Sequence, residues 1–257
     1  MAQPSCRFGC VRPSKFAHRA QTALYDATPD QNSADVMKSV LVVVDAALPW
    51  SEVMLSESQI NELLRPFGIA LKSHQTAQLS TYLNLLMRWN EKINLTAIRT
   101  PEECVTRHFA ESILLACHEQ LGGRLLDIGS GAGFPGLALK IVFPELGVTL
   151  LEPVAKKRAF LKEVTRSCGF SGVEVRQERL EDIRIAARYD AITMRAVGSG
   201  LIDQAARHLQ PSGKLYLWLS KSQAKELAAT GCNVEWGQPI EVPESRERII
   251  LLGGLKG

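Results

Sequence analysis

The 257-residue sequence lacks several features that mark particular classes of protein. It has no apolar run close to the roughly 18 residues that cross a membrane, because its longest candidate, residues 40–48, contains Asp45. Its six cysteines are scattered, and apart from Cys6 and Cys10 none has a spacing typical of metal ligands. We therefore expect reduced thiols, no bound metal, no membrane association and a cytoplasmic protein, which we take to be a monomer.

Strong charge of either sign is also missing. The net charge is +3, and hydrophobic residues make up 46% of the chain, as in an ordinary globular protein. The first twenty residues differ, since they hold four basic residues and no acid. Such a bias can mark a transit peptide. We favour a disordered extension or a misassigned start for residues 1–53, because a regular pattern begins at Met54.

Residues 125–136 carry the clearest pattern in the chain. An apolar run is followed by four glycines within eight residues and then by good helix formers. This order predicts a strand, a glycine turn and a helix. Glycine permits positive φ angles and close approach of a ligand, and a helix start presents free N–H groups. The residues that we expect to bind a cofactor here are Asp127, Gly129, Ser130, Gly131 and Gly133.

Two cofactors suit such a turn. The spacing Gly131-x-Gly133-x-x-Gly136 matches the dinucleotide pattern, whereas Asp127 followed by glycines at alternate positions matches the acidic turn of S-adenosylmethionine (SAM) enzymes. We favour SAM, because a carboxylate suits the ammonium group of a methionine and would repel a pyrophosphate. A turn that only packs a strand against a helix stays as a third interpretation.

A second acid supports a nucleoside ligand. The next predicted strand ends at Glu152, which lies 19 residues after Gly133. An acid at about this spacing accepts hydrogen bonds from ribose hydroxyls. NAD and SAM both contain that ribose, so Glu152 does not distinguish them.

From residue 124 onward, strand patterns alternate with helix patterns. Strands are predicted at residues 124–128, 148–152, 173–176, 191–194, 214–219, 234–236 and 248–252. Helices are predicted at residues 136–143, 156–168, 201–209 and 222–229. The alternation predicts a doubly wound, mostly parallel seven-stranded sheet, an α/β fold of the Rossmann-like type. Together with the preference for SAM, this corresponds to the fold of class I SAM methyltransferases. Asp127, Glu152 and Arg195 then meet at one edge of the sheet.

Residues 54–123 predict a small N-terminal helical unit ahead of the SAM-binding core at residues 124–257. A capping box at residues 56–59 starts the first helix. A second helix begins near Ser73 and breaks at residues 90–96, and Thr100 caps a third.

Two devices that methyltransferases use on particular acceptors are absent. No cysteine follows a predicted core strand, where it would activate a pyrimidine ring. The Asn/Asp-Pro-Pro-aromatic loop that methylates exocyclic amines is also missing, and Arg195-Ala196-Val197 stands after the fourth strand instead. What remains is an acceptor that is already nucleophilic, such as guanine N7 or a small molecule, which needs positioning more than a general base.

Several blocks together resemble one family. The most specific are Arg88-Trp89-Asn90 with Ile93-Asn94-Leu95-Thr96, and residues 127–136 with their ending Gly133-Phe134-Pro135-Gly136. The further blocks are Arg107-His108 with Glu111-Ser112-Ile113, Lys157-Arg158, Arg179-Leu180-Glu181, Arg195-Ala196 and Glu247-Arg248. Over about residues 54–252 the chain is thereby similar to the RsmG (GidB) family of bacterial rRNA methyltransferases.

The resemblance implies SAM-dependent methylation of N7 of one guanosine, guanine-527 in the usual rRNA numbering, in the decoding-region loop of 16S rRNA in the small ribosomal subunit. It implies that Gly129 and Phe134 line the SAM site, that Leu180 and Glu181 contact the adenine region, and that Arg195 closes over the cofactor. Glu152 stands where the family more often has aspartate, and either carboxylate suits a ribose. Residues 217–221 depart from the family's Leu-Lys-Gly block.

Other candidates have open roles. Asn94, Arg107 and His108 either position RNA or the cofactor loop, or bond to the protein's own backbone. Phe134 either stacks on a base or packs under the turn. The basic helix with Lys156, Lys157 and Arg158 meets either phosphates or only solvent.

Two further functions stay open at this point, an NAD-dependent oxidoreductase and a non-catalytic RNA-binding assembly module. Substitution of Gly129→Asp separates the module from the enzyme, because it should abolish SAM binding and leave RNA binding by a module intact.

Overall fold

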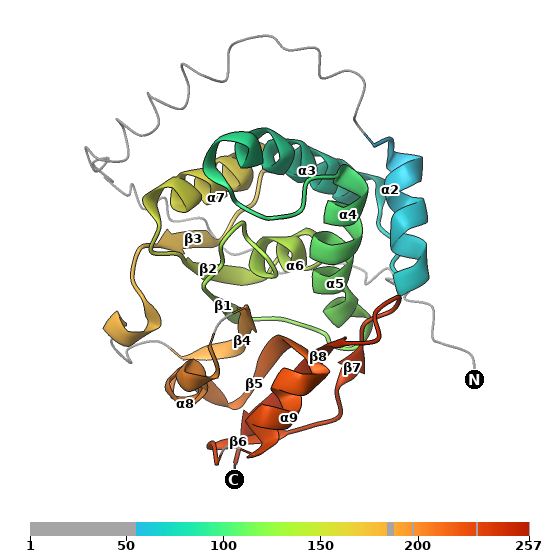
Figure 1. The fold of residues 1–257 in the computed structure, drawn as a ribbon. Coiled ribbons are helices and arrows are strands. Elements are labelled where there is room, and N and C mark those ends of the chain that lie inside the picture. The colour runs from blue at the N-terminus through green and yellow to red at the C-terminus, as the bar shows by residue number, and fades with distance from the viewer. Residues whose placement is uncertain (1–54, 184–187, 197, 230, 257) are drawn as a thin grey trace, which may run out of the picture.

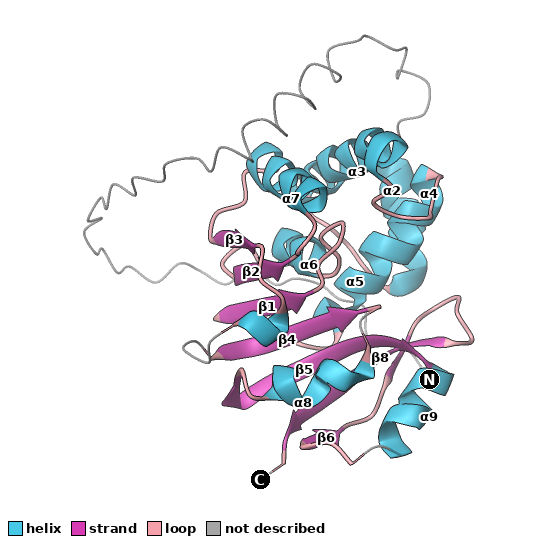
Figure 2. Ribbon diagram, turned by 60° about the vertical axis from the view of Figure 1, so that its left-hand side comes forward, coloured by secondary structure: helices cyan, strands magenta, loops and turns pink. Residues whose placement is uncertain are grey.

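The computed structural model describes residues 55–183, 188–196, 198–229 and 231–256, so the predicted extension at residues 1–53 lies outside the described residues. Within these ranges the strands form one eight-stranded sheet with helices on both faces (Figures 1 and 2). The strands are β1 (Arg124–Ile128), β2 (Gly147–Leu151), β3 (Val173–Arg176), β4 (Tyr189–Arg195), β5 (Leu209–Ser220), β6 (Val234–Trp236), β7 (Ile240–Glu241) and β8 (Arg248–Leu255).

The sheet is doubly wound and mostly parallel, as predicted. Its order is β3-β2-β1-β4-β5-β8-β6, and the neighbours from β3 to β5 are parallel. β8 runs antiparallel to β5, β6 and β7. The predicted count of seven strands is one too low, because β7 was missed. It has only two residues, too few to show an alternating pattern.

The two faces of the sheet are covered by different helices. Along β1 the side chains alternate: Leu125 packs in the hydrophobic cluster of α6 (Gly136–Val142) and α7 (Ala155–Ser167). Leu126 and Ile128 pack in the cluster of α8 (Ile202–Ala206) and α9 (Lys221–Ala229). This period of two is expected for a strand buried on both faces.

The N-terminal helical unit forms as the sequence predicts, with differences in its middle. The Ser56 hydroxyl accepts a hydrogen bond from Gln59 N, and Ser56 N donates to the Gln59 side chain, which confirms the capping box. The second helix ends at Ile93, within the predicted break at residues 90–96, and the capping residue Asn94 follows with a φ of 48°. The elements are α2 (Glu57–Leu64), η2 (Arg65–Phe67), α3 (Ser73–Ile93), α4 (Pro101–Cys104), η3 (Val105–Ala110), α5 (Glu111–Ile113) and η4 (Leu114–Cys117), of which η3 is a π-helix.

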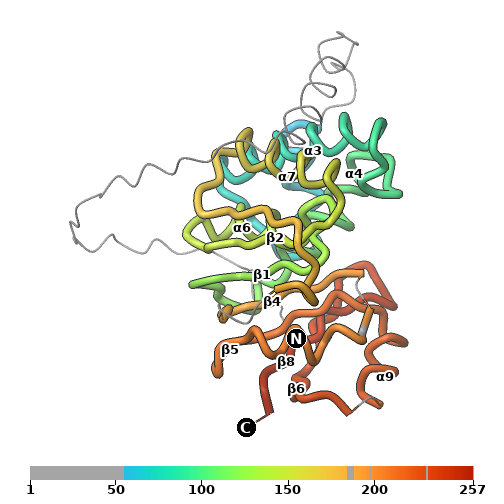
Figure 3. Tube along the Cα trace, turned by 90° about the vertical axis from the view of Figure 1, so that its left-hand side faces the viewer, coloured from blue at the N-terminus to red at the C-terminus, as the bar shows by residue number. Residues whose placement is uncertain are grey.

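The helical unit is fused to the core. Its apolar residues share one hydrophobic cluster with α6 and α7. Two glutamines of α3 bond to the core backbone, Gln75 Nε2 to the Ile141 carbonyl at 3.1 Å and Gln78 Nε2 to the Cys168 carbonyl at 2.9 Å. Figure 3 shows α3 and α4 near α7 at one end of the molecule, far from β6 and α9. The helical unit therefore packs beside α6 and α7, in the half of the fold that contains β1, β2 and the glycine turn; we call this the cofactor half.

Candidate functional site

The predicted site residues do meet at one edge of the sheet. In the ladder Ile128 pairs with both Leu151 and Met194, so the carboxyl ends of β1, β2 and β4 are neighbours. Asp127, Glu152 and Arg195 lie at these ends. The turn that follows β1 uses positive φ angles at three of its glycines, with φ 69° at Gly129, 56° at Gly131 and 90° at Gly133. Ligands of open α/β sheets bind at this edge.

The first part of the turn, residues 129–131, is open; we call it the front half. A Cβ atom added to Gly131 would meet only the Gly129 carbonyl oxygen, at 3.8 Å. Gly131 N donates to Glu152 Oε2 at 2.9 Å, and Val154 N donates to Glu152 Oε1 at 2.8 Å. Ser130 is buried, and its hydroxyl donates to the Asp127 carbonyl at 3.0 Å. The front half thus combines room for a ligand with a carboxylate held at its side.

The second part of the turn, residues 132–136, is closed; we call it the back half. The hydroxyl of Tyr82, on α3, donates to the Ala132 carbonyl. A Cβ atom at Gly133 would overlap this hydroxyl and lie 2.9 Å from Leu137 Cδ1. At Gly136 it would lie 2.8 Å from Asp127 Oδ2. The helical unit therefore holds the back half in place, and only glycine fits at positions 133 and 136.

Phe134 packs beneath the turn. Its ring stacks against His108 at a centroid distance of 4.8 Å and against Tyr82 at 5.2 Å, and Phe109 meets it edge-on at 4.9 Å. Only 7% of Phe134 is exposed. Of the two roles left open for this ring, the structure supports packing and leaves little surface for a stacked base. Its implied place in the lining of the SAM site stays a prediction.

Asp127 is fully buried under the turn. Its Oδ1 accepts a hydrogen bond from the Thr193 hydroxyl at 2.8 Å, and its Oδ2 accepts one from Gly136 N at 3.3 Å. Burial raises the pKa of this carboxyl to about 6, although these hydrogen bonds act in the opposite direction. The structure thus gives Asp127 internal partners, and its contact with a methionine ammonium stays a prediction.

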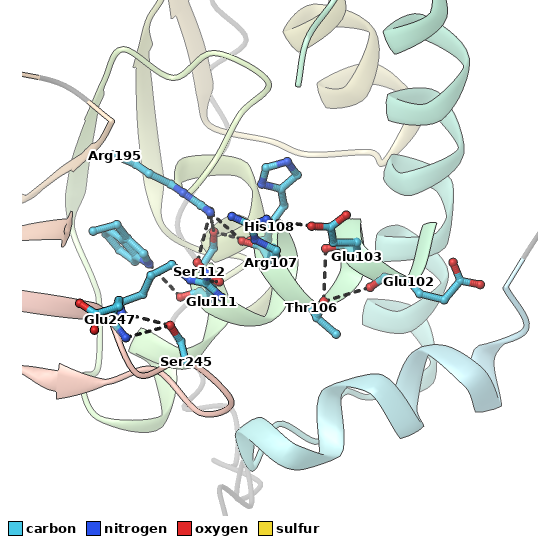
Figure 4. Close-up of polar contacts among 12 residues, drawn as sticks. Glu102, Glu103, Thr106, Arg107, His108, Glu111, Ser112, Arg195, Ser245 and Glu247 are labelled. Carbon is cyan, nitrogen blue, oxygen red and sulfur yellow. Dashed lines mark hydrogen bonds and ion pairs between the residues drawn. The ribbon is translucent and has the colours of Figure 1, made fainter. Parts of the chain in front are cut away.

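Arg195 reaches from the end of β4 to the helical unit (Figure 4). Its Nη2 donates to the Arg107 carbonyl at 2.6 Å and to Glu111 Oε2 at 3.2 Å. Glu111 also forms an ion pair with Arg248, with 2.7 Å between Oε1 and Nε. We did not predict Glu111 as a site residue, and its only signal was its place in the Glu111-Ser112-Ile113 block.

The three positioning candidates of the helical unit have different surroundings. His108 Nε2 lies 2.7 Å from the Thr96 hydroxyl, and the ring stacks on Phe134. Burial, with the nearby Arg195 and Arg107, lowers the pKa of His108 to about 3, so the imidazole is neutral at pH 7.

Asn94 and Arg107 lie on the outside. Asn94 accepts a hydrogen bond from Arg99 at 3.2 Å, and the Arg107 guanidinium pairs with Glu103 at 2.8 Å. Among the described residues, neither side chain forms a hydrogen bond or ion pair with the glycine turn. The Arg107 carbonyl does accept a hydrogen bond from Arg195.

Leu180 and Glu181 follow β3 in the short helix η5 (Leu180–Asp182). Leu180 is buried in the same cluster as Ile128 and Leu151, at the carboxyl ends of β1 and β2, whereas Glu181 is exposed. They follow β3, whose last residue, Arg176, pairs with Leu151 at the end of β2. Their contact with the adenine region, which the resemblance implies, stays a prediction.

The part of the chain that the structure describes contains no helix that is long and apolar enough to cross a membrane. It also contains no group of three or more His, Cys, Asp or Glu side chains placed to hold a metal ion.

Comparison with known proteins identifies relatives of this chain. Residues 75–248 match the family model described as rRNA small subunit methyltransferase G. The ribosomal RNA small subunit methyltransferase G of Chloroflexus aggregans is 36% identical over 211 residues, which cover 77% of this chain and 89% of that protein. That of Pseudomonas aeruginosa is 38% identical over 183 residues, covering 68% and 84%. The crystal structure of the glycopeptide N-methyltransferase MtfA has a TM-score of 0.50 at 12% identity, covers 58% of this chain and 90% of that one, and shows the fold alone.

Proposed function

The chain belongs to the rRNA small subunit methyltransferase G (GidB) family, and on that premise we propose that it methylates N7 of one guanosine, guanine-527 in the usual numbering, in the decoding-region loop of 16S rRNA. As a member of this family it is a SAM-dependent methyltransferase of 16S rRNA. Membership also favours this function over the NAD-dependent oxidoreductase and the non-catalytic module that the turn alone left open.

The open front half of the turn is the observation that carries the cofactor assignment. The space beside Gly131 admits a ligand against bare backbone, and Glu152 ends the neighbouring strand with a buried carboxylate. SAM, when bound, supplies an electrophilic methyl group on a sulfonium centre. We assign Glu152 to the ribose hydroxyls, and the backbone of Gly129, Ser130 and Gly131 to the amino-acid part.

The remaining cofactor contacts follow from position. We assign Leu180 and Glu181 to the adenine side, since they lie beside the end of β2. Arg195 borders the site at the end of β4, and Gly133 and Phe134 support the turn from behind. Asp127 fixes the start of α6 through its bond to Gly136 N.

The acceptor atom is consistent with the titratable groups at this edge. Guanine N7 carries no proton at neutral pH, so its methylation needs no general base and relies on positioning. His108 is neutral and hydrogen-bonded to Thr96, and Glu111 is held between two arginines. Both groups are thus paired within the protein, which fits a reaction that needs no general base.

The RNA partner accounts for the basic start of α7. Lys156 is exposed and Lys157 is half-buried at the helix start, beside the cofactor edge. Arg158 instead stabilises the chain after β2, because its guanidinium donates to the carbonyls of Glu152 and Pro153 at 3.1 and 2.6 Å. We propose that the two lysines approach rRNA phosphates, and that the enzyme acts as a monomer in the cytoplasm.

A labelling experiment tests the proposal. The protein is incubated with isotopically labelled SAM and small ribosomal subunits that lack native modification, and the label is mapped by the strand cleavage that 7-methylguanosine permits. Label on one decoding-loop guanosine is expected for the wild type, and none for Gly129→Asp. Label at another atom or nucleotide would contradict the proposed acceptor and leave the cofactor assignment standing.

A further inference from the structure

A group of charged side chains lies beside the methyl-transfer edge, and Arg195 is its one predicted cofactor contact. Glu111, with 3% of its side chain exposed, accepts a hydrogen bond from Arg195 and forms an ion pair with Arg248 (Figure 4). Arg107 lies one turn before Glu111 and is close enough to influence the pKa of Arg195 and Glu111. We call Arg107, Glu111, Arg195 and Arg248 the arginine cluster.

The arginine cluster holds more positive charge than its carboxylate neutralises. Arg107 is paired with Glu103, which leaves Arg195 and Arg248 to share Glu111. Asp127 also acts on Arg195, but its carboxylate is bonded to Thr193 and Gly136 N under the glycine turn. Within the cluster, two cations therefore face one anion. Glu247 is exposed, and its side chain points away from the cluster in Figure 4. An unbalanced charge that is partly removed from water is attractive to an anion.

The surplus charge is presented by Arg248. Its side chain is 38% exposed, against 19% for Arg195. Its Nε is buried against Glu111 Oε1, at 2.7 Å. Its two Nη groups form no hydrogen bond to another described residue. A guanidinium with donors to spare is suited to the oxygens of a phosphate, which it can bind in bidentate fashion.

The backbone places the arginine cluster at the same sheet edge as the glycine turn, next to the ends of β4 and β5. Arg195 ends β4, and Arg248 pairs with Ser220 at the end of β5. Trp218 Nε1 donates to the Glu111 carbonyl at 2.8 Å, which fastens α5 to β5. The glycine turn and Glu152 occupy the ends of β1 and β2, and β4 with Arg195 lies between them and β8. Arg248 therefore lies on the far side of Arg195 from the predicted cofactor contacts of β1 and β2.

We propose that the arginine cluster is a phosphate subsite, which binds a phosphodiester of the RNA substrate next to the target guanosine. Arg248 makes the contact from the solvent side. Glu111 is a positioning residue that holds the guanidinium groups of Arg195 and Arg248 side by side. The assignment rests on the proposed function in one respect, that the substrate is RNA.

The test compares Arg248→Gln and Arg248→Lys with Arg207→Gln. Arg207 is an exposed arginine at the end of α8, beside the opposite edge of the sheet, and serves as the matched control. Binding of 16S rRNA is measured over a range of salt concentrations, and SAM binding separately. Arg248→Gln should weaken RNA binding about tenfold at low salt and lower the slope of log K against log[salt] by about 1.

The other variants sharpen the result. Arg248→Lys should keep the salt slope and lose part of the RNA affinity, because lysine retains the charge but cannot bind a phosphate in bidentate fashion. Arg207→Gln should change neither. SAM binding should be unchanged in all three, and melting temperatures should stay close to wild type because Arg195 and Glu111 still form a neutral pair.

Two outcomes would overturn the subsite. One is an Arg248→Gln variant with the wild-type salt slope. The other is weakened SAM binding with an unchanged slope, which would assign the cluster to the carboxylate of the cofactor. The slope reports on RNA contact whichever nucleotide is methylated, so failure of the subsite is distinguishable from failure of the guanine-N7 assignment.

Discussion

The two halves of the glycine turn use glycine for opposite reasons. In the front half, Gly131 leaves space that the protein does not fill. In the back half, Gly133 is needed because Tyr82 and Leu137 already occupy the space that a side chain would take. The same residue type, two positions apart, thus leaves room in one place and permits close packing in the other. The consequence is that substitutions in the two halves should separate cofactor binding from stability.

The largest effect is expected for Gly133→Ala. The added methyl group would collide with the Tyr82 hydroxyl and Leu137, at a φ of 90° that side chains rarely adopt. We expect a loss of about 3 kcal/mol or more in the free energy of unfolding, measured by urea denaturation.

Gly131→Ala is the matched control in the front half. There the methyl group has room, and the φ of 56° lies in the left-handed region, so the loss of stability should be about 1 kcal/mol. SAM affinity should fall more in this variant than its stability predicts. Equal losses of stability in both variants would contradict the distinction between the halves.

Glu152→Gln should act on the cofactor. The amide keeps one acceptor for the N–H groups of Gly131 and Val154 and loses the charge that favours ribose hydroxyls. We expect SAM binding, measured by calorimetry, to weaken by about ten- to a hundredfold, as for the loss of one or two charge-assisted hydrogen bonds. Unchanged affinity would remove Glu152 from the site.

Tyr82→Phe should act on the back half. The ring stays in its stack with Phe134, and the Ala132 carbonyl loses its donor, which costs about 1–2 kcal/mol when a buried acceptor is left unpaired. Tyr216→Phe is the control, because that hydroxyl donates to Glu119 at 3.1 Å, away from the turn. Both variants should lose stability in thermal melting, and only Tyr82→Phe should also weaken SAM binding.

The smallest expected effect is on the pH dependence of the free energy of unfolding. The fold lowers the pKa of His108 from 6.5 to about 3, so the unfolded chain binds the proton more readily, and stability is lost as the pH falls below 6.5. Asp127, with its pKa raised from 3.8 to about 6, has the opposite sign, since its contribution is lost as the pH rises through 6.

His108→Phe removes only the first of these effects and keeps an aromatic ring beside Phe134. Between about pH 7 and pH 5.5 the variant should lose less unfolding free energy than the wild type. Identical pH dependence, measured by urea denaturation at both values, would show that His108 does not titrate as inferred.

The local features of the site could be predicted from the sequence. Residues 125–136 form the predicted strand, turn and helix, because apolar runs and glycines act over a few residues. The capping box at Ser56 and the cap at Thr100 are confirmed for the same reason. The positions of Glu152 and Arg195 followed from parallel strand order alone.

The contacts between distant segments could not be predicted. Tyr82 has the spacing of a core residue on α3, and nothing near it in the chain shows that its hydroxyl meets a carbonyl 50 residues away. Glu111 lies in an apolar helix and acquires its two arginines from β4 and β8. Such partners depend on how the layers stack, which sequence periodicity does not specify.

β8 also has a consequence for the order in which the site is completed during synthesis. It follows every other described strand in the chain and yet lies between β5 and β6 in the sheet. The glycine turn, Tyr82 and Glu152 all precede it by many residues, so the cofactor half can close around SAM while β5 still has an unpaired edge. Arg248 begins β8, so its proposed RNA contact is added last, after the lysines of α7. A nascent chain should therefore be able to hold its methyl donor before its RNA site is complete.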